Sequence, residues 1–155
     1  MLPELMNDLL NQKSILYIED DVVVLTAYRE RLRNAGFNVE GTLDGLEAMR
    51  ILSAREFDLI ILDLMLPRFS GGEILQAVRA NPRLKNIPVL IFSTNIESAE
   101  DPLVALADRA LFRGNCSFAT MLQTIHELLP DEDHPEMNHD GADTSDTTFL
   151  FGQIA

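Results

Sequence analysis

Apolar and polar residues alternate along the chain in segments that predict strands and helices in turn. Short apolar or alternating segments predict β-strands at residues 14–18, 37–41, 58–63, 87–93 and, more briefly, 110–112. Between the strands, apolar residues recur at helical spacing at residues 22–36, 44–56, 72–81 and 117–129. This alternation predicts an α/β fold in which helices cover both faces of a parallel sheet.

Two of the predicted helices illustrate the pattern. In the segment 44–56, Leu46, Met49 and Leu52 recur at helical spacing and are expected to face the core. A short helix is also predicted between the last two strands, capped at Asp101 with Pro102 at its first position. Each strand is therefore followed by a helix that can return the chain to the start of the next strand.

Two segments lie outside this alternation. The N-terminal segment carries Leu2, Leu5, Met6 and Leu9 on one face, which predicts a short amphipathic helix of the kind that packs on another surface or dimerises. The C-terminal segment has seven acidic residues and no Lys or Arg, which is typical of disorder, although it ends in the apolar sequence FLFGQIA. We therefore expect a helical extension, a globular domain and an acidic tail at residues 1–12, 13–130 and 131–155.

Charge and composition exclude several classes of function. The formal net charge is −13, of which the tail carries −7 and residues 1–130 carry −6, and no basic patch is visible. Such a chain repels a phosphate backbone, so direct binding to nucleic acid is not expected. No apolar run approaches the ~18 residues of a membrane span, so membrane insertion is not expected either. The single cysteine, Cys116, and the lack of a secretory signal favour the reducing cytoplasm.

Charged and polar residues follow the carboxyl ends of the predicted strands. Glu19 and Asp20 follow the first strand, Asp63 ends the third, Ser93 ends the fourth and Arg113 follows the fifth. Parallel strands bring these ends to one edge of the sheet, with neighbours ~4.8 Å apart, so the three carboxylates should converge. Two carboxylates 4 Å apart repel by ~4 kcal/mol at an effective dielectric of 20, so the cluster needs a proton or a cation. An all-oxygen set of ligands suits Mg²⁺.

Over residues 14–129 the chain resembles the receiver domain of bacterial response regulators. The resemblance rests on ILYIEDD for the acidic pair, LIILDLMLPRFSGGE for the phosphoacceptor strand and loop, and IPVLIFST for the hydroxyl position. It implies a flavodoxin-like, doubly wound, five-stranded parallel sheet with strand order 2-1-3-4-5. It also implies a stand-alone receiver of the chemotaxis-regulator type.

The resemblance assigns roles to the residues at the sheet edge. Asp63 would accept a phosphoryl group from a histidine kinase or a phosphotransfer protein. Asp20, Asp63 and the backbone carbonyl of Met65 would bind Mg²⁺, and Glu19 would assist through water. Ser93 would hydrogen-bond a phosphoryl oxygen. These roles are chemically consistent, because a carboxylate can attack phosphorus once a metal neutralises the charge around it.

The chain departs from the family pattern near the fifth strand. Arg113-Gly114 stands in the place of the family's Lys-Pro pair. The planar guanidinium group of Arg is not equivalent to the compact ammonium group of Lys. Ala110 stands where the family has an aromatic switch residue, so no ring is available to rotate behind Ser93. The segment between Ser93 and Arg113 is also shorter than usual. The phosphorylation site is therefore expected to be intact and the relay to be altered.

The leading expectation is a module that is switched by phosphorylation and acts through a downstream protein partner, because no output domain is recognised after Leu129. The alternative is a degenerate receiver that serves as a phosphorylation-independent interaction module. A homodimer is a further option, and the sequence does not rank the N-terminal helix, the apolar tail end and the short fourth helix as contact surfaces.

Enzymes built on similar sheets do not fit the sequence. Phosphatases with an aspartate nucleophile require Asp-x-Asp after the first strand, where this chain has Glu19-Asp20-Asp21. A flavin site needs a loop that cradles phosphate, and Asp20 and Asp21 would repel phosphate at that position. The chain is therefore not expected to be an enzyme, apart from slow self-dephosphorylation.

Overall fold

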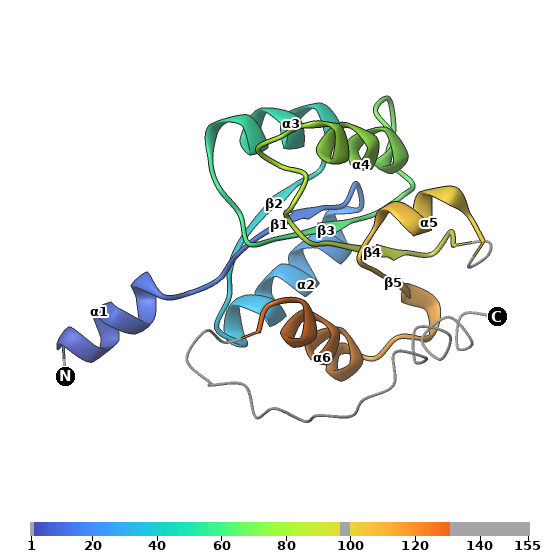
Figure 1. Cartoon of the computed structure of the whole chain (residues 1–155). Helices are drawn as coiled ribbons and strands as arrows, with labels where there is room; N and C mark the ends of the chain where they lie inside the picture. The colour runs from blue at the N-terminus through green and yellow to red at the C-terminus, as the bar shows by residue number, and fades with distance from the viewer. Residues whose placement is uncertain (1, 97–99, 131–155) are drawn as a thin grey trace, which may run out of the picture.

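A five-stranded sheet forms the centre of the computed structural model, which describes residues 2–96 and 100–130 (Figure 1). Every strand pair is parallel, and the strand order is β2-β1-β3-β4-β5. The strands are β1 (Ser14–Ile18), β2 (Asn38–Thr42), β3 (Leu59–Leu62), β4 (Val89–Ser93) and β5 (Arg109–Phe112). The predicted flavodoxin-like doubly wound fold is thereby confirmed.

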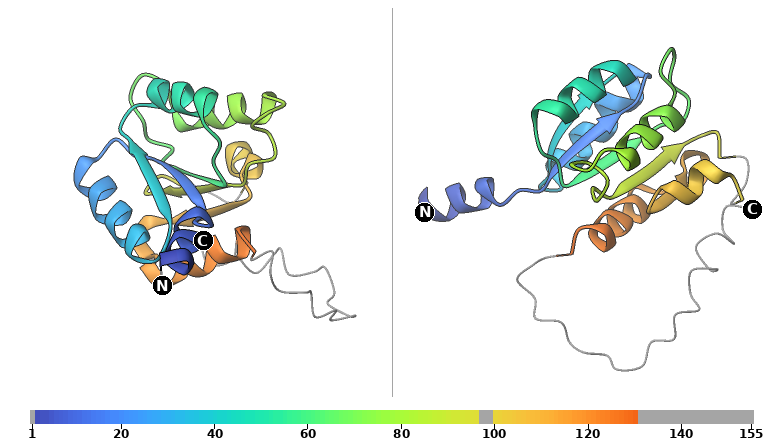
Figure 2. Two further views of the ribbon diagram at one scale, coloured as in Figure 1. Left: turned by 90° about the vertical axis from the view of Figure 1, so that its left-hand side faces the viewer. Right: turned by 45° about the horizontal axis from the view of Figure 1, so that its top comes forward.

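Helices cover both faces of this sheet (Figures 1 and 2). One face carries α2 (Val22–Asn34) and α6 (Phe118–Leu128), and the other carries α3 (Gly45–Ala54), α4 (Gly71–Ala80) and α5 (Pro102–Leu106). A 3₁₀ turn, η1 (Arg113–Asn115), joins β5 to α6. The apolar runs of the sequence follow from this arrangement, because a strand between two helix layers must bury the side chains on both of its faces.

The two faces of β1 supply two separate apolar layers. Ile15 and Tyr17 pack in the layer that includes α2 and α6, whereas Leu16 and Ile18 pack in the layer that includes α3, α4 and α5. All four side chains are fully buried. Because successive side chains point to opposite faces of a strand, β1 contributes to both layers of the core. Burial on both faces holds β1 rigidly up to the residue before Glu19.

Capping residues determine where the helices after the strands begin. The Asp21 carboxylate accepts hydrogen bonds from the backbone of α2, and Ser70 with Glu73 forms a reciprocal capping box at the start of α4. Asp101 caps α5 with Pro102 at its first position, as the sequence predicted. These caps fix the lengths of the loops that carry the acidic residues.

The prediction that Leu46 faces the core is wrong. Its exposed fraction is 55%, whereas Ala48 and Leu52 are fully buried. The start of α3 lies so close to the loop after β3 that a Cβ at Gly45 would be 2.6 Å from the Phe69 carbonyl oxygen. Gly45 is therefore on the buried side of α3. The next residue, Leu46, then points toward solvent at the carboxyl edge of the sheet.

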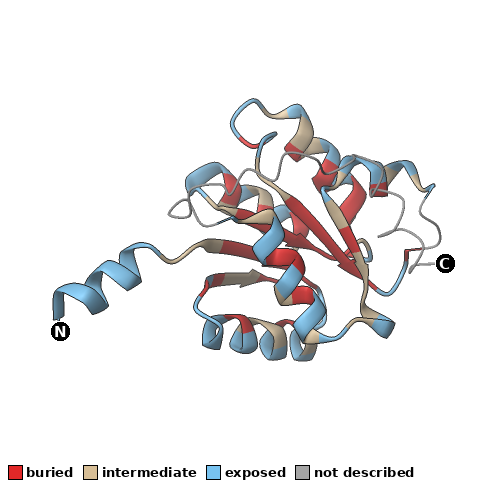
Figure 3. Cartoon of the chain, turned by 60° about the horizontal axis from the view of Figure 1, so that its bottom comes forward, coloured by how far each residue is buried: buried red, intermediate tan, exposed pale blue. Residues whose placement is uncertain are grey.

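The N-terminal segment forms the predicted helix, α1 (Leu2–Leu10), and none of its residues is buried. It extends away from the sheet and its covering helices (Figures 1 and 3). The acidic tail at residues 131–155 lies outside the described residues, and the division of the chain at residues 12 and 130 stays a prediction. In the part of the chain that the structure describes, no helix is long and apolar enough to span a membrane.

Candidate metal centre at the carboxyl ends of the strands

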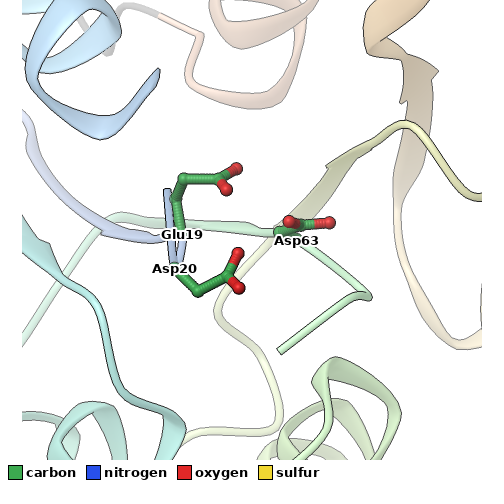
Figure 4. Close-up of side chains that lie close together, drawn as sticks. All are labelled: Glu19, Asp20 and Asp63. Carbon is green, nitrogen blue, oxygen red and sulfur yellow. The ribbon is translucent and has the colours of Figure 1, made fainter. Parts of the chain in front are cut away.

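Three carboxylates meet at the carboxyl edge of the sheet. Glu19 and Asp20 follow β1 and Asp63 follows β3, and one carboxylate oxygen of each lies within 4.8 Å of the others (Figure 4). Glu19 and Asp63 are buried, with exposed fractions of 0% and 2%, while Asp20 is exposed. The convergence expected from the topology is therefore present, with the opening of the site on the side of Asp20.

The backbone holds the two buried acids in place. The Glu19 N–H donates to the Thr42 carbonyl at 3.1 Å, and the Asp63 N–H donates to the Ile18 carbonyl at 3.0 Å. Both bonds continue the sheet pattern by one residue beyond the strands. The carboxylates are thus anchored to the most rigid part of the fold, although like charges in a buried site repel one another.

Asp63 is oriented by donors on both sides. Ser93 Oγ, fully buried at the end of β4, donates to Asp63 Oδ1 at 2.6 Å, and the Met65 N–H donates to the same oxygen at 3.1 Å. Among the described residues, no hydrogen bond reaches Asp63 Oδ2. One oxygen is therefore held while the other is available for a ligand or for chemistry. The predicted role of the Met65 carbonyl as a ligand stays a prediction.

Arg113 lies at the same edge but pairs with Glu19. Its Nη1 donates to Glu19 Oε2 at 2.5 Å, and the exposed fractions of the two side chains are 18% and 0%. The guanidinium carbon also lies 6.0 Å from the centre of the Phe92 ring. The predicted phosphoryl-contacting Arg is thus present at the site, bound in this state to a neighbouring acid rather than to Asp63.

The surroundings of Glu19 favour its protonated form. Burial and the charge of Asp63 raise the pKa of Glu19 to about 7, although the Asp21 N–H and Arg113 lower it in part. The Asp21 N–H donates to Glu19 Oε1 at 3.2 Å. Glu19 is therefore a carboxylate that a cation would stabilise more than an ordinary exposed acid.

Ala110 lies on the face of the sheet that α3, α4 and α5 cover. It is buried in β5, in the apolar layer that includes Val104 of α5 and Ile91 of β4. The aromatic contacts near the site lie on the opposite face, where the Tyr28 ring centre is 5.0 Å from that of Phe92 and 6.5 Å from that of Tyr17. That no ring can rotate behind Ser93 stays a prediction.

Asn95 is a residue at this edge that the sequence reasoning missed. Its N–H donates to Ser93 Oγ at 3.2 Å, and its side-chain amide contacts the Met65 sulfur at 3.0 Å. It therefore connects the loop after β4 with the loop after β3, on either side of Asp63. In the sequence, the only indication that Asn95 belongs to this edge is its position two residues after the end of a predicted strand.

Gly71 provides a test of how tightly the site is built. A Cβ at this position would lie 2.3 Å from the Asp63 carbonyl oxygen and 2.7 Å from Leu64 Cα, so Gly71→Ala must separate α4 from the loop that carries Asp63. We expect a loss of about 1–3 kcal/mol in the free energy of unfolding, measured in urea.

Gly72→Ala is the matched control for Gly71→Ala. The new Cβ would meet only the end of the flexible Leu103 side chain, at 2.9 Å, and alanine favours a helix. Its free energy of unfolding should therefore be less affected or even increase. Equal losses in the two variants would contradict the close packing of Gly71 on Asp63.

Comparison with known proteins agrees with this geometry. The model of the response regulator receiver domain family matches residues 15–112. The polar-differentiation response regulator DivK of Brucella anthropi is 31% identical over 120 residues, which cover 77% of this chain and 98% of DivK. The chemotaxis protein CheY4 of Vibrio cholerae has a TM-score of 0.70 at 28% identity, covering 76% of this chain and 99% of that chain.

A longer relative shows how far the similarity extends. The probable transcriptional regulator ycf29 of Porphyra purpurea is 38% identical over 80 residues, which are 52% of this chain and 38% of that protein. The chain thus spans little more than a third of that relative. With the family match, the full-length similarity to DivK and the clustered acids at the sheet edge, the chain belongs to the response regulator receiver domain family of two-component signalling.

Proposed function

We propose that this receiver takes a phosphoryl group on Asp63 from a histidine kinase or a phosphotransfer protein, with Mg²⁺, and signals through protein contacts. The observation that carries the proposal is the group of three carboxylates within 4.8 Å, with Ser93 Oγ 2.6 Å from Asp63. The donor set consists of oxygens only and one of its acids is exposed, which suits a hard, partly hydrated ion.

The residues that would hold Mg²⁺ are Asp20, Asp63 and the Met65 carbonyl, with Glu19 assisting through water. When bound, the ion supplies positive charge that lets an anionic carboxylate and an anionic phosphoryl group approach each other. The raised pKa of Glu19 and the repulsion within the cluster both support a site made for a cation.

The chain's own residues then have separate tasks in the transfer. Asp63 Oδ2 forms the new O–P bond while the P–N bond to the donor histidine breaks and its electron pair returns to the imidazole. Ser93, which now donates to Asp63 Oδ1, is placed to donate to a phosphoryl oxygen instead. Arg113 can offer its guanidinium to the same group if it releases Glu19.

The proposed output is a contact with a downstream protein. Net charge of −13 disfavours nucleic acid as the direct target, and the single Cys116 suits a reducing compartment, so we place the protein in the cytoplasm. We assign no turnover of a separate substrate to the chain, apart from slow hydrolysis of its own aspartyl phosphate.

The second candidate is a degenerate receiver that binds partners without phosphorylation. Two observations favour it: Ala110 leaves no ring behind Ser93, and Arg113 is engaged by Glu19. In this case the acidic cluster would be a feature of the fold without a role in switching.

Incubation with acetyl phosphate distinguishes the two candidates. We expect the intact mass to increase by one phosphoryl group when Mg²⁺ is present and to stay unchanged when EDTA is added, because the carboxylates repel the donor unless a cation is bound. Absence of a mass increase at saturating Mg²⁺ would favour the degenerate receiver.

A further inference from the structure

The helix α1 presents an apolar face that no described residue buries. The exposed fractions on this face are large: Leu2 76%, Leu5 58%, Met6 59%, Leu9 65% and Leu10 78%. Figure 3 shows α1 exposed along its whole length and apart from the rest of the fold. A helix of nine residues is marginal in water on its own, so packing of this face on another surface would stabilise it.

The same chain contains a second apolar segment. Residues 149–155 (FLFGQIA) include Phe149, Leu150, Phe151 and Ile154 and carry no charged side chain. The 18 residues before them, 131–148, contain all seven acids of the tail. Residues 131–155 lie outside the described part of the chain, and they follow directly after the segment that ends with α6.

Both segments are attached to the same edge of the sheet. Residues 11–13 join α1 to the first residue of β1, at the edge where the strands begin. α6 ends at this edge too, because the ring of His126 in its last turn contacts that of Phe37, directly before β2, at 5.7 Å. The acidic segment therefore starts at the edge from which α1 extends.

The connecting segment has a larger mean span than the length of α1. Eighteen residues of a flexible chain have a root-mean-square span of about 23 Å, whereas the nine residues of α1 are only about 14 Å long. A tethered segment of this length reaches its target at an effective concentration in the millimolar range. Intramolecular contact is therefore favoured over contact with a separate molecule of low abundance.

The charge of the chain and the small area of α1 disfavour other binding partners for the apolar face of α1. Glu4 and Asp8 lie on the opposite side of α1 from its apolar face, and the chain's charge of −13 opposes binding to anionic lipid. Two such helices from different copies would bury far less than the ~800 Å² per partner of a stable interface. The apolar face and residues 149–155 are both uncharged, so the acidic tail does not prevent their contact.

We propose that residues 149–155 pack on the apolar face of α1 within the same molecule. The acidic segment 131–148, which carries seven acids, serves as the tether. Any protein that binds the apolar face of α1 must first displace the chain's own segment. The proposed contact lies toward the edge of the sheet where the strands begin, opposite to the edge that carries Asp63.

Hydrogen exchange of the full chain tests this contact. In the variant Phe149→Ser/Phe151→Ser we expect the amides of α1 to exchange at least about tenfold faster than in the wild type, because the cover loses two large apolar side chains. The control His134→Ser/Met137→Ser changes the tether by the same number of side chains and should leave exchange in α1 unchanged. Amides of the central strands report that the domain remains folded in both variants.

Two results would overturn the proposal. The first is equal exchange of α1 in the wild type and in the Phe149→Ser/Phe151→Ser variant, which would mean that residues 149–155 do not cover it. The second is protection that disappears on dilution together with a dimer in sedimentation, which would identify a second copy as the occupant. Protection that is lost in the variant and independent of concentration supports the intramolecular contact.

Discussion

Asp63→Asn is expected to abolish the uptake of a phosphoryl group from acetyl phosphate. The amide keeps the shape of the side chain and can still accept from Ser93 Oγ, so the buried hydrogen bond of 2.6 Å can remain. It lacks the anionic oxygen that would attack phosphorus, and it removes one of the three charges that would attract Mg²⁺. Intact-mass measurement with Mg²⁺ should therefore show the wild type modified and the variant unmodified.

Asp44→Asn is the matched control for this experiment. Asp44 lies at the same edge of the sheet and caps α3 by accepting from the Leu46 N–H at 2.9 Å, a role that asparagine performs equally well. This control should take up the phosphoryl group as the wild type does. Uptake by Asp63→Asn to the level of the control would show that another residue is modified, and the assignment of Asp63 would fail.

The metal-free protein should lose stability as the pH rises from about 4.5 to about 7. Glu19 titrates near 4.5 when unfolded and near 7 when folded, so the folded state holds its proton to higher pH than the unfolded state does. The stabilisation that comes from the bound proton is complete below the pKa of Glu19 in the unfolded chain. It is lost as the pH rises through the pKa of Glu19 in the folded protein. The difference corresponds to about 3 kcal/mol in the free energy of unfolding.

Urea unfolding in EDTA, repeated across this pH range, measures the effect. Glu19→Gln should flatten the pH dependence and stabilise the metal-free protein above pH 7, because the buried amide carries no charge. Glu47→Gln is a suitable control, since Glu47 is an exposed acid that pairs with Arg50 at 3.5 Å on the surface of α3. A pH dependence that persists unchanged in Glu19→Gln would show that other groups cause it. Mg²⁺ should reduce the loss in the wild type by stabilising the ionised form.

Much of the fold could be predicted from the local pattern of residues. Strands between two helix layers must be apolar on both faces, so β1, β3 and β4 are visible as short apolar runs. Parallel pairing then places every strand end at one edge, and that alone predicts the meeting of Glu19, Asp20 and Asp63. Caps such as Asp101 were predictable as well, because they satisfy backbone groups only a few residues away.

The contacts between distant loops could not be predicted in this way. Arg113 pairs with Glu19 rather than with Asp63 because of where β5 and η1 lie relative to β1. The two paired residues are 94 positions apart in the chain. The exposure of Leu46 follows from the approach of Phe69 to Gly45, since helical spacing defines a face but not its direction. Local sequence specifies strands, helices and caps because the interactions that form them span only a few residues. The ion-pair partner of a side chain, and whether that side chain is buried, depend on which surfaces the packed layers bring together.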